Sequence, residues 1–144
     1  MILPDVNLLI HAYNSSSTVH QAARQWWEDL LSDDEPVRLA WVAVLGFLRL
    51  STHRQISSHP LPIAASCGIV ETWLERPQVD LIQPGARHAA ILFGFLRTTG
   101  AGGNLTTDAH LAALAIEHGA ELCTTDSDFS RFAGLRWRNP LSKS

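Results

Sequence analysis

Four aspartates stand beside short apolar runs typical of strands, and carboxylates in such positions are candidates for metal-assisted chemistry. Asp5 follows the apolar run at the amino end, Asp126 and Asp128 follow the run ELCTT, and Asp108 opens the helical segment that leads to that run. Carboxylates a few ångströms apart raise one another's pKa or repel. A divalent cation removes that cost, and oxygen-only ligands suit the hard ions Mg²⁺ and Mn²⁺. Such an ion lowers the pKa of a bound water and neutralises charge on a reacting phosphate.

Each aspartate also has a purely structural interpretation. Asp5 can be the N-cap of a short helix over residues 6–12. Asp108 lies in the tripeptide TTD, where either threonine caps a helix equally well, so its carboxylate can serve only the helix dipole. Asp126 and Asp128 can form an Asx-turn. Single positions therefore do not decide between a structural role and a chemical one.

The elements that position these aspartates are β-type runs alternating with segments of helical period. Helical period is clearest over Thr18 to Leu31, where apolar residues recur at i, i+3, i+4 and i+7. The pattern predicts other helices over residues 41–50, from Leu61-Pro62 to Leu74, after Pro84-Gly85, and from a Thr106 or Thr107 cap to Gly119. The predicted strands are Met1 to Leu3, Val37 to Ala40, Val79 to Ile82, Glu121 to Thr124 and Leu135 to Arg138.

Strands separated by helices predict an α/β fold with a mainly parallel central sheet flanked by helices, because parallel neighbours need long crossover connections. The chain has no repeat or linker, so residues 1–144 are expected to form a single domain. In such sheets the ligand site lies beyond the carboxyl ends of the strands. This geometry brings the aspartates together whatever caps they form, with Asn7 and Thr124 near enough to orient ligands or water.

Composition excludes several classes of protein. With 144 residues, 46% hydrophobic and 17% charged, the chain can bury a core without disulfides or a structural metal. Its longest apolar run, Leu39 to Leu48, has ten residues, whereas a membrane span needs about 20. The amino end has no basic segment before its apolar run, so it does not resemble a signal peptide. We expect a cytoplasmic protein with no membrane segment.

The basic residues narrow the chemistry further. Lys143 is the lone lysine among 11 Lys and Arg, which excludes Schiff bases, P-loops and Ser/Lys hydrolases. The net charge of −3 argues against a protein that binds nucleic acid through its overall charge, so any such contact must use a local arginine patch. Neither cysteine has a second Cys or His at a metal-clip spacing, and the histidines have no zinc spacing.

The sequence resembles the PIN-domain ribonucleases, and more closely the VapC toxins of bacterial toxin–antitoxin pairs, over nearly the whole chain. The resemblance rests on DVNLL from Asp5, FLRLST over 47–52, GNLTTDAHLAALAIEHGA over 103–120, TTDSDF over 124–129 and GLRWRNPL over 134–141. It implies a three-layer PIN-like fold and a Mg²⁺-dependent endoribonuclease that cleaves RNA needed for translation. It also implies a VapB-type antitoxin as partner and a homodimer.

Carried over by position, the resemblance makes Asp5 and Asp108 the principal metal ligands, with Asp126 completing the catalytic cluster and Asp128 nearby. One departure from the family pattern concerns the helix after the second strand. Many PIN domains have a glutamate there, whereas this chain has Gly46. Glu117 cannot replace it, because nine residues at 100° each place Glu117 and Asp108 on opposite faces of their helix.

A ribonuclease also needs cations for the substrate phosphates, and arginine suits bidentate contact with phosphate. The candidates are Arg49, Arg54, Arg131, Arg136 and Arg138. Arg49 is favoured for contact with substrate or antitoxin, with Asn7 and Thr124 as further substrate-binding residues. A solvated charge at a helix end explains Arg49 equally well.

Two other functions compete with a nuclease. A phosphoacceptor receiver domain also clusters aspartates at parallel strand ends, but its acidic pocket uses an internal lysine that this chain lacks. A catalytically weak PIN-like module would bind RNA or antitoxin without turnover, because Gly46 supplies no ligand.

Overall fold

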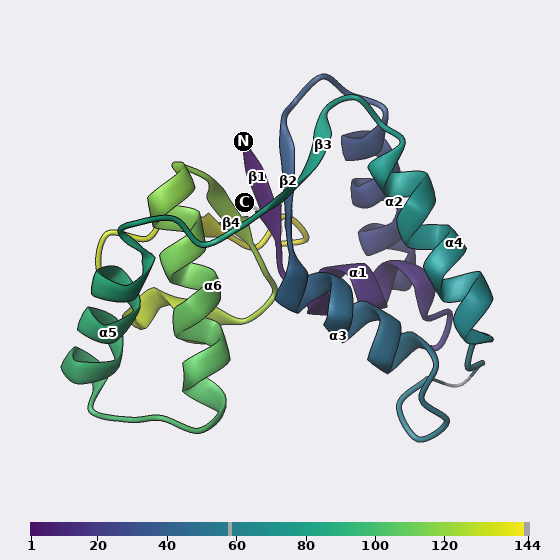
Figure 1. Cartoon of the computed structure of the whole chain (residues 1–144). Helices are drawn as coiled ribbons and strands as arrows, with labels where there is room; N and C mark the ends of the chain where they lie inside the picture. The colour runs from purple at the N-terminus through teal and green to yellow at the C-terminus, as the bar shows by residue number, and fades with distance from the viewer. Residues whose placement is uncertain (58, 143–144) are drawn as a thin grey trace.

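The computed structural model describes residues 1–57 and 59–142, so Lys143 lies outside the described residues. The order of helices and strands is the predicted one, with strand ends moved by one or two residues (Figure 1). The elements are β1 (Ile2–Pro4), α1 (Val6–Tyr13), α2 (His20–Leu31), β2 (Val37–Ala40), α3 (Trp41–Ser51), α4 (Ile63–Leu74), β3 (Val79–Ile82), α5 (His88–Thr99), α6 (Asn104–His118), β4 (Glu121–Cys123), η1 (Ser127–Arg131) and β5 (Trp137–Arg138).

The sheet has the order β3-β2-β1-β4-β5, and all of its strand pairs are parallel. Leu3 pairs with Leu122, and Leu39 pairs with Leu81. The chain extends the sheet from β1 to β3 and then returns to the other side of β1 with β4. This reversal is a switch point of the kind that binds ligands beyond the carboxyl ends of strands. Asp5 follows β1 directly, so it lies at that point.

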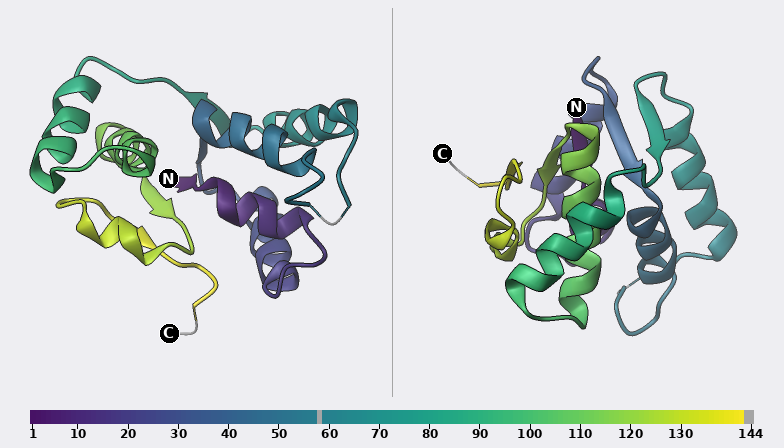
Figure 2. Two further views of the ribbon diagram at one scale, coloured as in Figure 1. Left: turned by 90° about the horizontal axis from the view of Figure 1, so that it is seen from below. Right: turned by 60° about the vertical axis from the view of Figure 1, so that its left-hand side comes forward.

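Helices cover both faces of the sheet and give three layers (Figures 1 and 2). Alternate residues of one strand face opposite sides. Ile2 therefore packs into the core cluster formed with α1, α2, α3 and α4. Its neighbour Leu3 packs into the cluster formed with α6 and η1, against which α5 packs. Both faces of the central strands are thus buried, as is usual for parallel sheets.

The start of α6 differs from the prediction. The helix begins at Asn104, and its N-cap is Gly103, whose φ of 62° and ψ of −131° belong to a region that glycine enters readily. Thr106 and Thr107 lie inside the first turn, so neither is the cap. Asp108 is consequently the fifth residue of α6 and does not open the helix. The carboxylate of Asp108 therefore interacts less favourably with the helix dipole than a residue at the start of α6 would, because this interaction fades beyond the first turn.

An aromatic cluster fills the core on the α1 to α4 side of the sheet. Trp73 packs edge-on against Trp27 and Phe47, with ring centroids 5.3 and 4.8 Å apart. Its indole N–H donates to the hydroxyl of Tyr13 at 2.9 Å. Trp41, in contrast, is 43% exposed on α3. None of the helices formed by residues 1–57 and 59–142 is long and apolar enough to cross a membrane.

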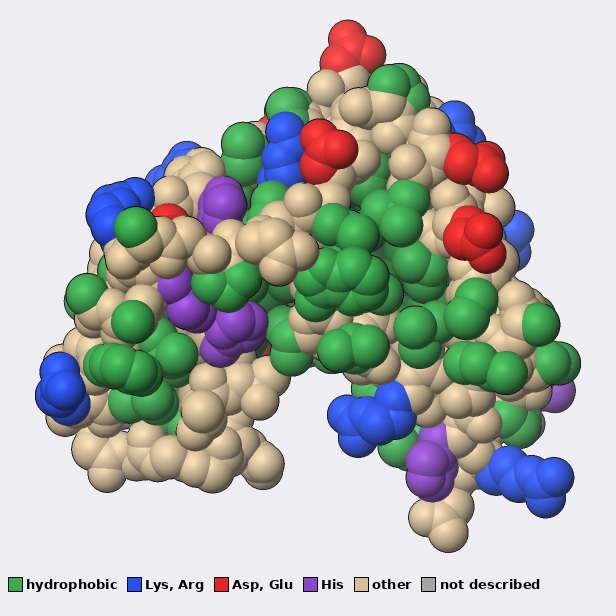
Figure 3. Space-filling model, in the orientation of Figure 1, with side chains coloured by type: hydrophobic (Ala, Val, Ile, Leu, Met, Phe, Trp, Pro, Cys, Tyr) green, Lys and Arg blue, Asp and Glu red, His purple; other side chains and the backbone are tan. Residues whose placement is uncertain are grey.

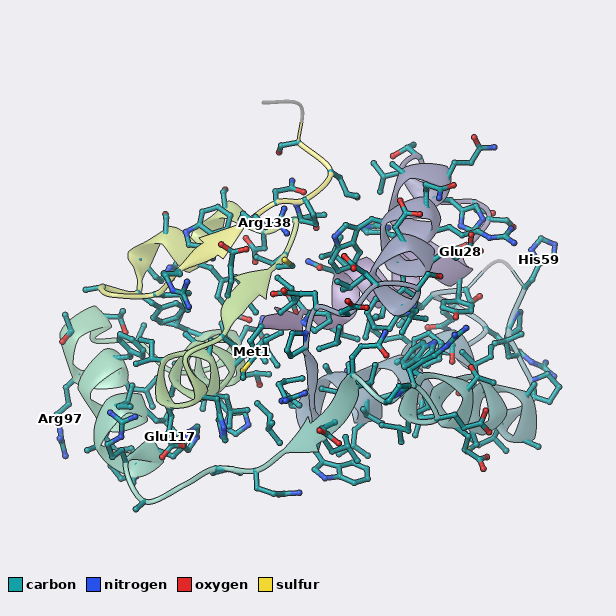
Figure 4. All side chains as sticks on the ribbon, turned by 90° about the horizontal axis from the view of Figure 1, so that it is seen from above. Met1, Glu28, His59, Arg97, Glu117 and Arg138 are labelled. Carbon is teal, nitrogen blue, oxygen red and sulfur yellow. The ribbon has the colours of Figure 1, made fainter. Side chains whose placement is uncertain are left out.

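Glu117 fastens α6 to the beginning of α5 (Figure 4). Its two carboxylate oxygens accept hydrogen bonds from the Gly85 N–H at 2.7 Å and the Arg87 N–H at 2.9 Å. Its position on the face of α6 away from Asp108 agrees with the helical-wheel prediction. These amides, that of Gly85 foremost, hold the pKa of Glu117 below its ordinary value of 4.5. A carboxylate whose pKa is lower in the folded than in the unfolded state stabilises the fold above its unfolded pKa.

We therefore expect Glu117→Gln to lower the melting temperature at pH 7. As the pH falls toward the folded-state pKa of Glu117, the wild-type protein loses this stabilisation, so the difference between the two proteins should be smaller at pH 3 than at pH 7. Differential scanning calorimetry of both proteins at pH 7 and pH 3 measures this difference in melting temperature. Glu71→Gln, at an exposed position on α4, is the matched control and should show little difference at either pH. An equal deficit of Glu117→Gln at both pH values would contradict the role of the charge.

Candidate active site

Asp5 is held at the end of β1 by contacts from three directions. Its N–H donates to the Cys123 carbonyl at 2.8 Å and so continues the β1–β4 ladder. Its Oδ1 accepts from the Val6 N–H at 2.7 Å, so Asp5 is the N-cap of α1 as predicted. Its Oδ2 accepts from the Thr124 hydroxyl at 2.8 Å. Each carboxylate oxygen still has a lone pair free, so capping and metal binding are compatible at Asp5.

Thr124 connects the two central strand ends. Its side chain is fully buried, and its hydroxyl donates to Asp5 and accepts from the Asp126 N–H at 3.0 Å. The Asn7 amide group approaches the same hydroxyl at 3.5 Å, a distance at which a hydrogen bond is weak. The Thr124 side chain therefore has no surface to offer a substrate, and the structure supports a positioning role in place of the predicted substrate contact.

Asp108 projects from α6 into the cleft that Asp5 also lines. The cleft has a volume of about 100 Å³, and its wall includes Thr107 and Leu111 from α6. Burial, followed by the charges of Asp5 and Asp126, raises the pKa of Asp108 from 3.8 to about 6. Burial, with a smaller effect of the Asp126 charge, also raises the pKa of Asp5. Asp5, Asp108 and Asp126, which we call the acid cluster, thus lie near enough for the charge of Asp126 to raise the pKa of both Asp5 and Asp108.

Asp126 and Asp128 form the predicted Asx-turn. The Oδ1 atom of Asp126 accepts from the Asp128 N–H at 2.9 Å and caps η1. The side chain of Asp128 is 66% exposed and lies 3.7 Å from the Arg131 guanidinium. Its charge is the weakest of the acidic contributions to the pKa of Asp108. Metal ligation by Asp128 stays a prediction, and among the four aspartates its geometry supports that role least.

The acid cluster provides oxygen donors that fit a hard divalent cation. Within residues 1–57 and 59–142, no three His, Cys, Asp or Glu side chains are already arranged around one ion position. Mg²⁺ needs only one or two carboxylates when waters and substrate phosphates complete its octahedron. The raised pKa of Asp108 reflects burial first and then repulsion by Asp5 and Asp126, and such an ion would relieve the repulsion. In addition, the buried side-chain oxygen Oδ1 of Asn7 has no hydrogen-bond partner among the described residues and could accept from a metal-bound water.

The α3 wall of the cleft carries no carboxylate. Val42, Ala43, Gly46 and Arg49 line it, at spacings that place them on one face of the helix. A Cβ atom on Gly46 would lie 3.0 Å from Cγ2 of Val6, the residue after Asp5. Glycine at this position therefore allows α1 and α3 to approach closely. A glutamate here would have to displace Val6 before its carboxylate could reach the acid cluster.

Gly46→Ala tests this close approach. Replacing glycine by alanine inside a helix stabilises the folded state by roughly 1 kcal/mol, whereas overpacking of a core typically destabilises it by about 1–3 kcal/mol. We expect Gly46→Ala to be neutral or destabilising in the wild type and stabilising in a Val6→Ala background. A double-mutant cycle by urea denaturation should give a coupling of about 1–2 kcal/mol. Additive effects would show that Val6 moves aside freely.

One residue of the site was missed from the sequence: Thr107 lines the cleft, but its TTD context indicated only a helix cap. Phosphate contact by Arg131 stays a prediction; in the structure this residue pairs with Asp128 and lowers the pKa of Asp108. The i,i+3 spacing from Asp128 to Arg131 is the sequence signal for this pairing.

The family model for the PIN domain matches residues 2–135. The chain is also 42% identical over 141 residues to ribonuclease VapC33 of Mycobacterium tuberculosis, covering 98% of this chain and 99% of that protein. The chain belongs to the VapC family of PIN-domain ribonucleases. Ribonuclease VapC37 of the same organism is 44% identical over 140 residues, with 97% of each chain covered. The predicted family and the predicted α/β fold are therefore confirmed.

Solved structures share the PIN fold at lower identity. VapBC-1 from nontypeable Haemophilus influenzae aligns with a TM-score of 0.70 at 18% identity, covering 99% of this chain and 100% of that chain. VapC20 of Mycobacterium tuberculosis, described as a toxin that cleaves the sarcin-ricin loop, aligns with a TM-score of 0.67 at 18% identity, covering 94% and 99%. At this identity the likeness shows the fold alone.

Proposed function

We propose that this PIN-domain protein is a Mg²⁺-dependent endoribonuclease toxin that cleaves RNA required for translation. The observation that carries the proposal is the convergence of Asp5 from β1 and Asp108 from α6 on one cleft, with Asp126 close enough to raise both pKa values. Clustered carboxylates with perturbed pKa values at the switch point of an α/β sheet are typical of a functional site.

In this proposal Asp5 and Asp108 hold the ion, Asp126 completes the acid cluster, and Asp128 stands at its edge. The bound ion supplies an acidified water and charge neutralisation for attack on a phosphodiester. Thr124 fixes the carboxylate of Asp5, and the N-cap bond to Val6 fixes it from the other side. Asn7 faces the same network and is suited to orient a water. These residues therefore pre-organise the ligands before substrate arrives.

The test compares cleavage of total cellular RNA by the purified protein with Mg²⁺, with Mn²⁺ and with EDTA. We expect cleavage with either ion, none in EDTA, and none from Asp5→Ala. Asp80→Asn, at an exposed carboxylate on β3, is the matched control and should cleave normally. If the wild-type protein cuts no RNA with any divalent ion, the nuclease proposal fails. The result would then favour a PIN-like module that binds RNA or antitoxin without turnover, and the lack of a carboxylate on the α3 wall of the cleft supports that alternative.

An antitoxin partner belongs to the same proposal. Several similar structures are toxin–antitoxin complexes, among them VapBC2 of Rickettsia felis bound to a DNA fragment from its promoter. A hollow of about 370 Å³ between α1 and α2 is lined by the exposed side chains of Tyr13 and Arg24, and aromatic and arginine side chains are frequent anchors of protein interfaces. Co-expression with the protein encoded by the neighbouring gene should yield a stable complex in which RNA cleavage is inhibited.

A homodimer is the other assembly we propose. Trp41 is 43% and Leu45 58% exposed, and their i,i+4 spacing puts both on one side of α3. Hydrophobic side chains gather in the middle of the face seen in Figure 3, between the two lobes of the molecule. Light scattering should give twice the chain mass, and Leu45→Asp should reduce it to that of one chain.

A further inference from the structure

The wall that α3 contributes to the cleft carries a positive charge. Arg49 is one helical turn beyond Gly46 on the face that lines the cleft with Asp5 and Asp108. The helix contains no Asp or Glu, so its one charged group at the cleft is a guanidinium. The two walls therefore differ in sign: α6 presents a carboxylate and α3 presents a cation.

The Arg49 guanidinium is not paired with the carboxylates across the cleft. Among residues 1–57 and 59–142, no ion pair includes Arg49, whereas Arg24, Arg38, Arg131 and Arg138 each lie within 4 Å of a carboxylate. The charges that shift the pKa of Asp108 come from Asp5, Asp126, Asp128 and Arg131, and not from Arg49. The side chain is exposed. An unpaired cation beside an acidic cleft is available to an anionic group that enters it.

The surface around Arg49 has room for such a group. Figure 3 shows a notch between the lobe of α5 and α6 and the lobe of α3, and basic side chains lie along its α3 edge. The facing loop between α5 and α6 consists of Gly100, Ala101, Gly102 and Gly103 and has no charge. A phosphate held at the acid cluster would therefore meet positive charge from the protein on its α3 side.

We infer that Arg49 is a catalytic residue of the proposed nuclease: its guanidinium contacts the scissile phosphate and stabilises the charge that grows on the non-bridging oxygens in the transition state. The inference rests on the proposed function and deepens it. Planar guanidinium donors suit two phosphate oxygens at once. Preorganised donors aimed at developing charge are among the largest contributions to catalysis, with losses of about 100- to 1,000-fold when one is removed. Arg49 thus supplies charge from the wall on which Gly46 provides no metal ligand.

The test measures turnover and Mn²⁺ binding on the same variants. For Arg49→Gln we expect kcat to fall about 100-fold while KM changes by less than about 5-fold, because the contact strengthens in the transition state. Arg49→Lys keeps the charge without the two-pronged geometry and should recover part of the loss. Mn²⁺ affinity, measured by electron paramagnetic resonance of the free ion, should stay equal or become tighter, because a repelling cation has been removed.

Arg97→Gln is the matched control, since Arg97 is exposed on α5 and points away from the rest of the protein (Figure 4). It should leave kcat, KM and Mn²⁺ affinity unchanged. A raised KM with unchanged kcat for Arg49→Gln would show that Arg49 binds the substrate and the transition state equally well, which would overturn the inference. Weakened Mn²⁺ binding or a lowered melting temperature would show a structural role and overturn it as well. Failure of the wild-type protein to cleave RNA would instead defeat the proposed function, so the two failures are distinguishable.

Discussion

Replacing Asp108 by asparagine is expected to abolish RNA cleavage and to raise the melting temperature of the metal-free protein by about 2–4 °C at pH 7. The gain in stability follows from the pKa of Asp108, which is raised from 3.8 to about 6. The folded state disfavours the charged form by up to about 3 kcal/mol, which we discount to about 1 kcal/mol because the carboxylate is partly exposed to screening solvent. The loss of cleavage follows from the proposed role of Asp108 as a metal ligand.

The pH dependence of this gain has a definite sign. A carboxyl whose folded pKa exceeds its unfolded pKa destabilises the fold above the folded pKa, and the penalty disappears as the pH falls to the unfolded value. The advantage of Asp108→Asn should therefore be full at pH 7, shrink through pH 6 and vanish near pH 4. Thermal melts in EDTA measure it, with Asp80→Asn as the exposed control. Stabilisation that persists at pH 4 would contradict the electrostatic explanation.

Addition of Mg²⁺ should raise the melting temperature of the wild-type protein but not that of Asp108→Asn. An ion that binds only the folded state stabilises it by mass action. Wild-type protein should therefore melt at a higher temperature with Mg²⁺ than in EDTA, whereas Asp108→Asn should not respond. Equal responses of both proteins would remove Asp108 from the metal site while leaving the metal-free stability result unaffected.

Much of the fold follows from local patterns in the sequence. Alternation of strand-like and helical runs predicted the order of elements, and the need for crossover connections predicted parallel pairing. The start of α6 was missed because Gly103 caps the helix through its backbone conformation and carries no side-chain signal, while Thr106 offered a familiar one. A glycine cap is visible only when the backbone is known.

The acid cluster was predictable because strand ends converge by topology. The hydrogen bonds that hold its side chains were not predictable. Asp5 and Thr124 are 119 positions apart, and the spacing in the sequence gives no indication that one donates to the other. Arg49 was favoured from the sequence for contact with substrate or antitoxin, but a solvated charge at a helix end explained it equally well. Gly46 could be recognised as a departure from the family, but the position of Arg49 on the same cleft required the packing of α1 against α3.

Thr124→Val should weaken both the fold and the proposed reaction, because it removes a hydroxyl without changing the shape of the side chain. The part-buried Asp126 N–H would lose its acceptor, and this loss costs up to the roughly 1–3 kcal/mol of a fully buried unsatisfied group. Asp5 would lose the hydroxyl that lowers its pKa, so its charged form would be disfavoured further. Loss of such supporting contacts typically reduces metal affinity or activity by about 10- to 100-fold.

Thr124→Ser separates the hydroxyl from the packing. Serine retains the donor to Asp5 and the acceptor for the Asp126 amide but loses a buried methyl group, so it should cost about 1 kcal/mol of stability and little turnover. Valine should lose about 2 kcal/mol and most of the cleavage rate, as measured by urea denaturation and by initial rates at saturating Mg²⁺. Because valine keeps the methyl and serine keeps the oxygen, a higher rate for valine than for serine would show that packing, and not the hydrogen bonds to Asp5 and Asp126, positions the acid cluster.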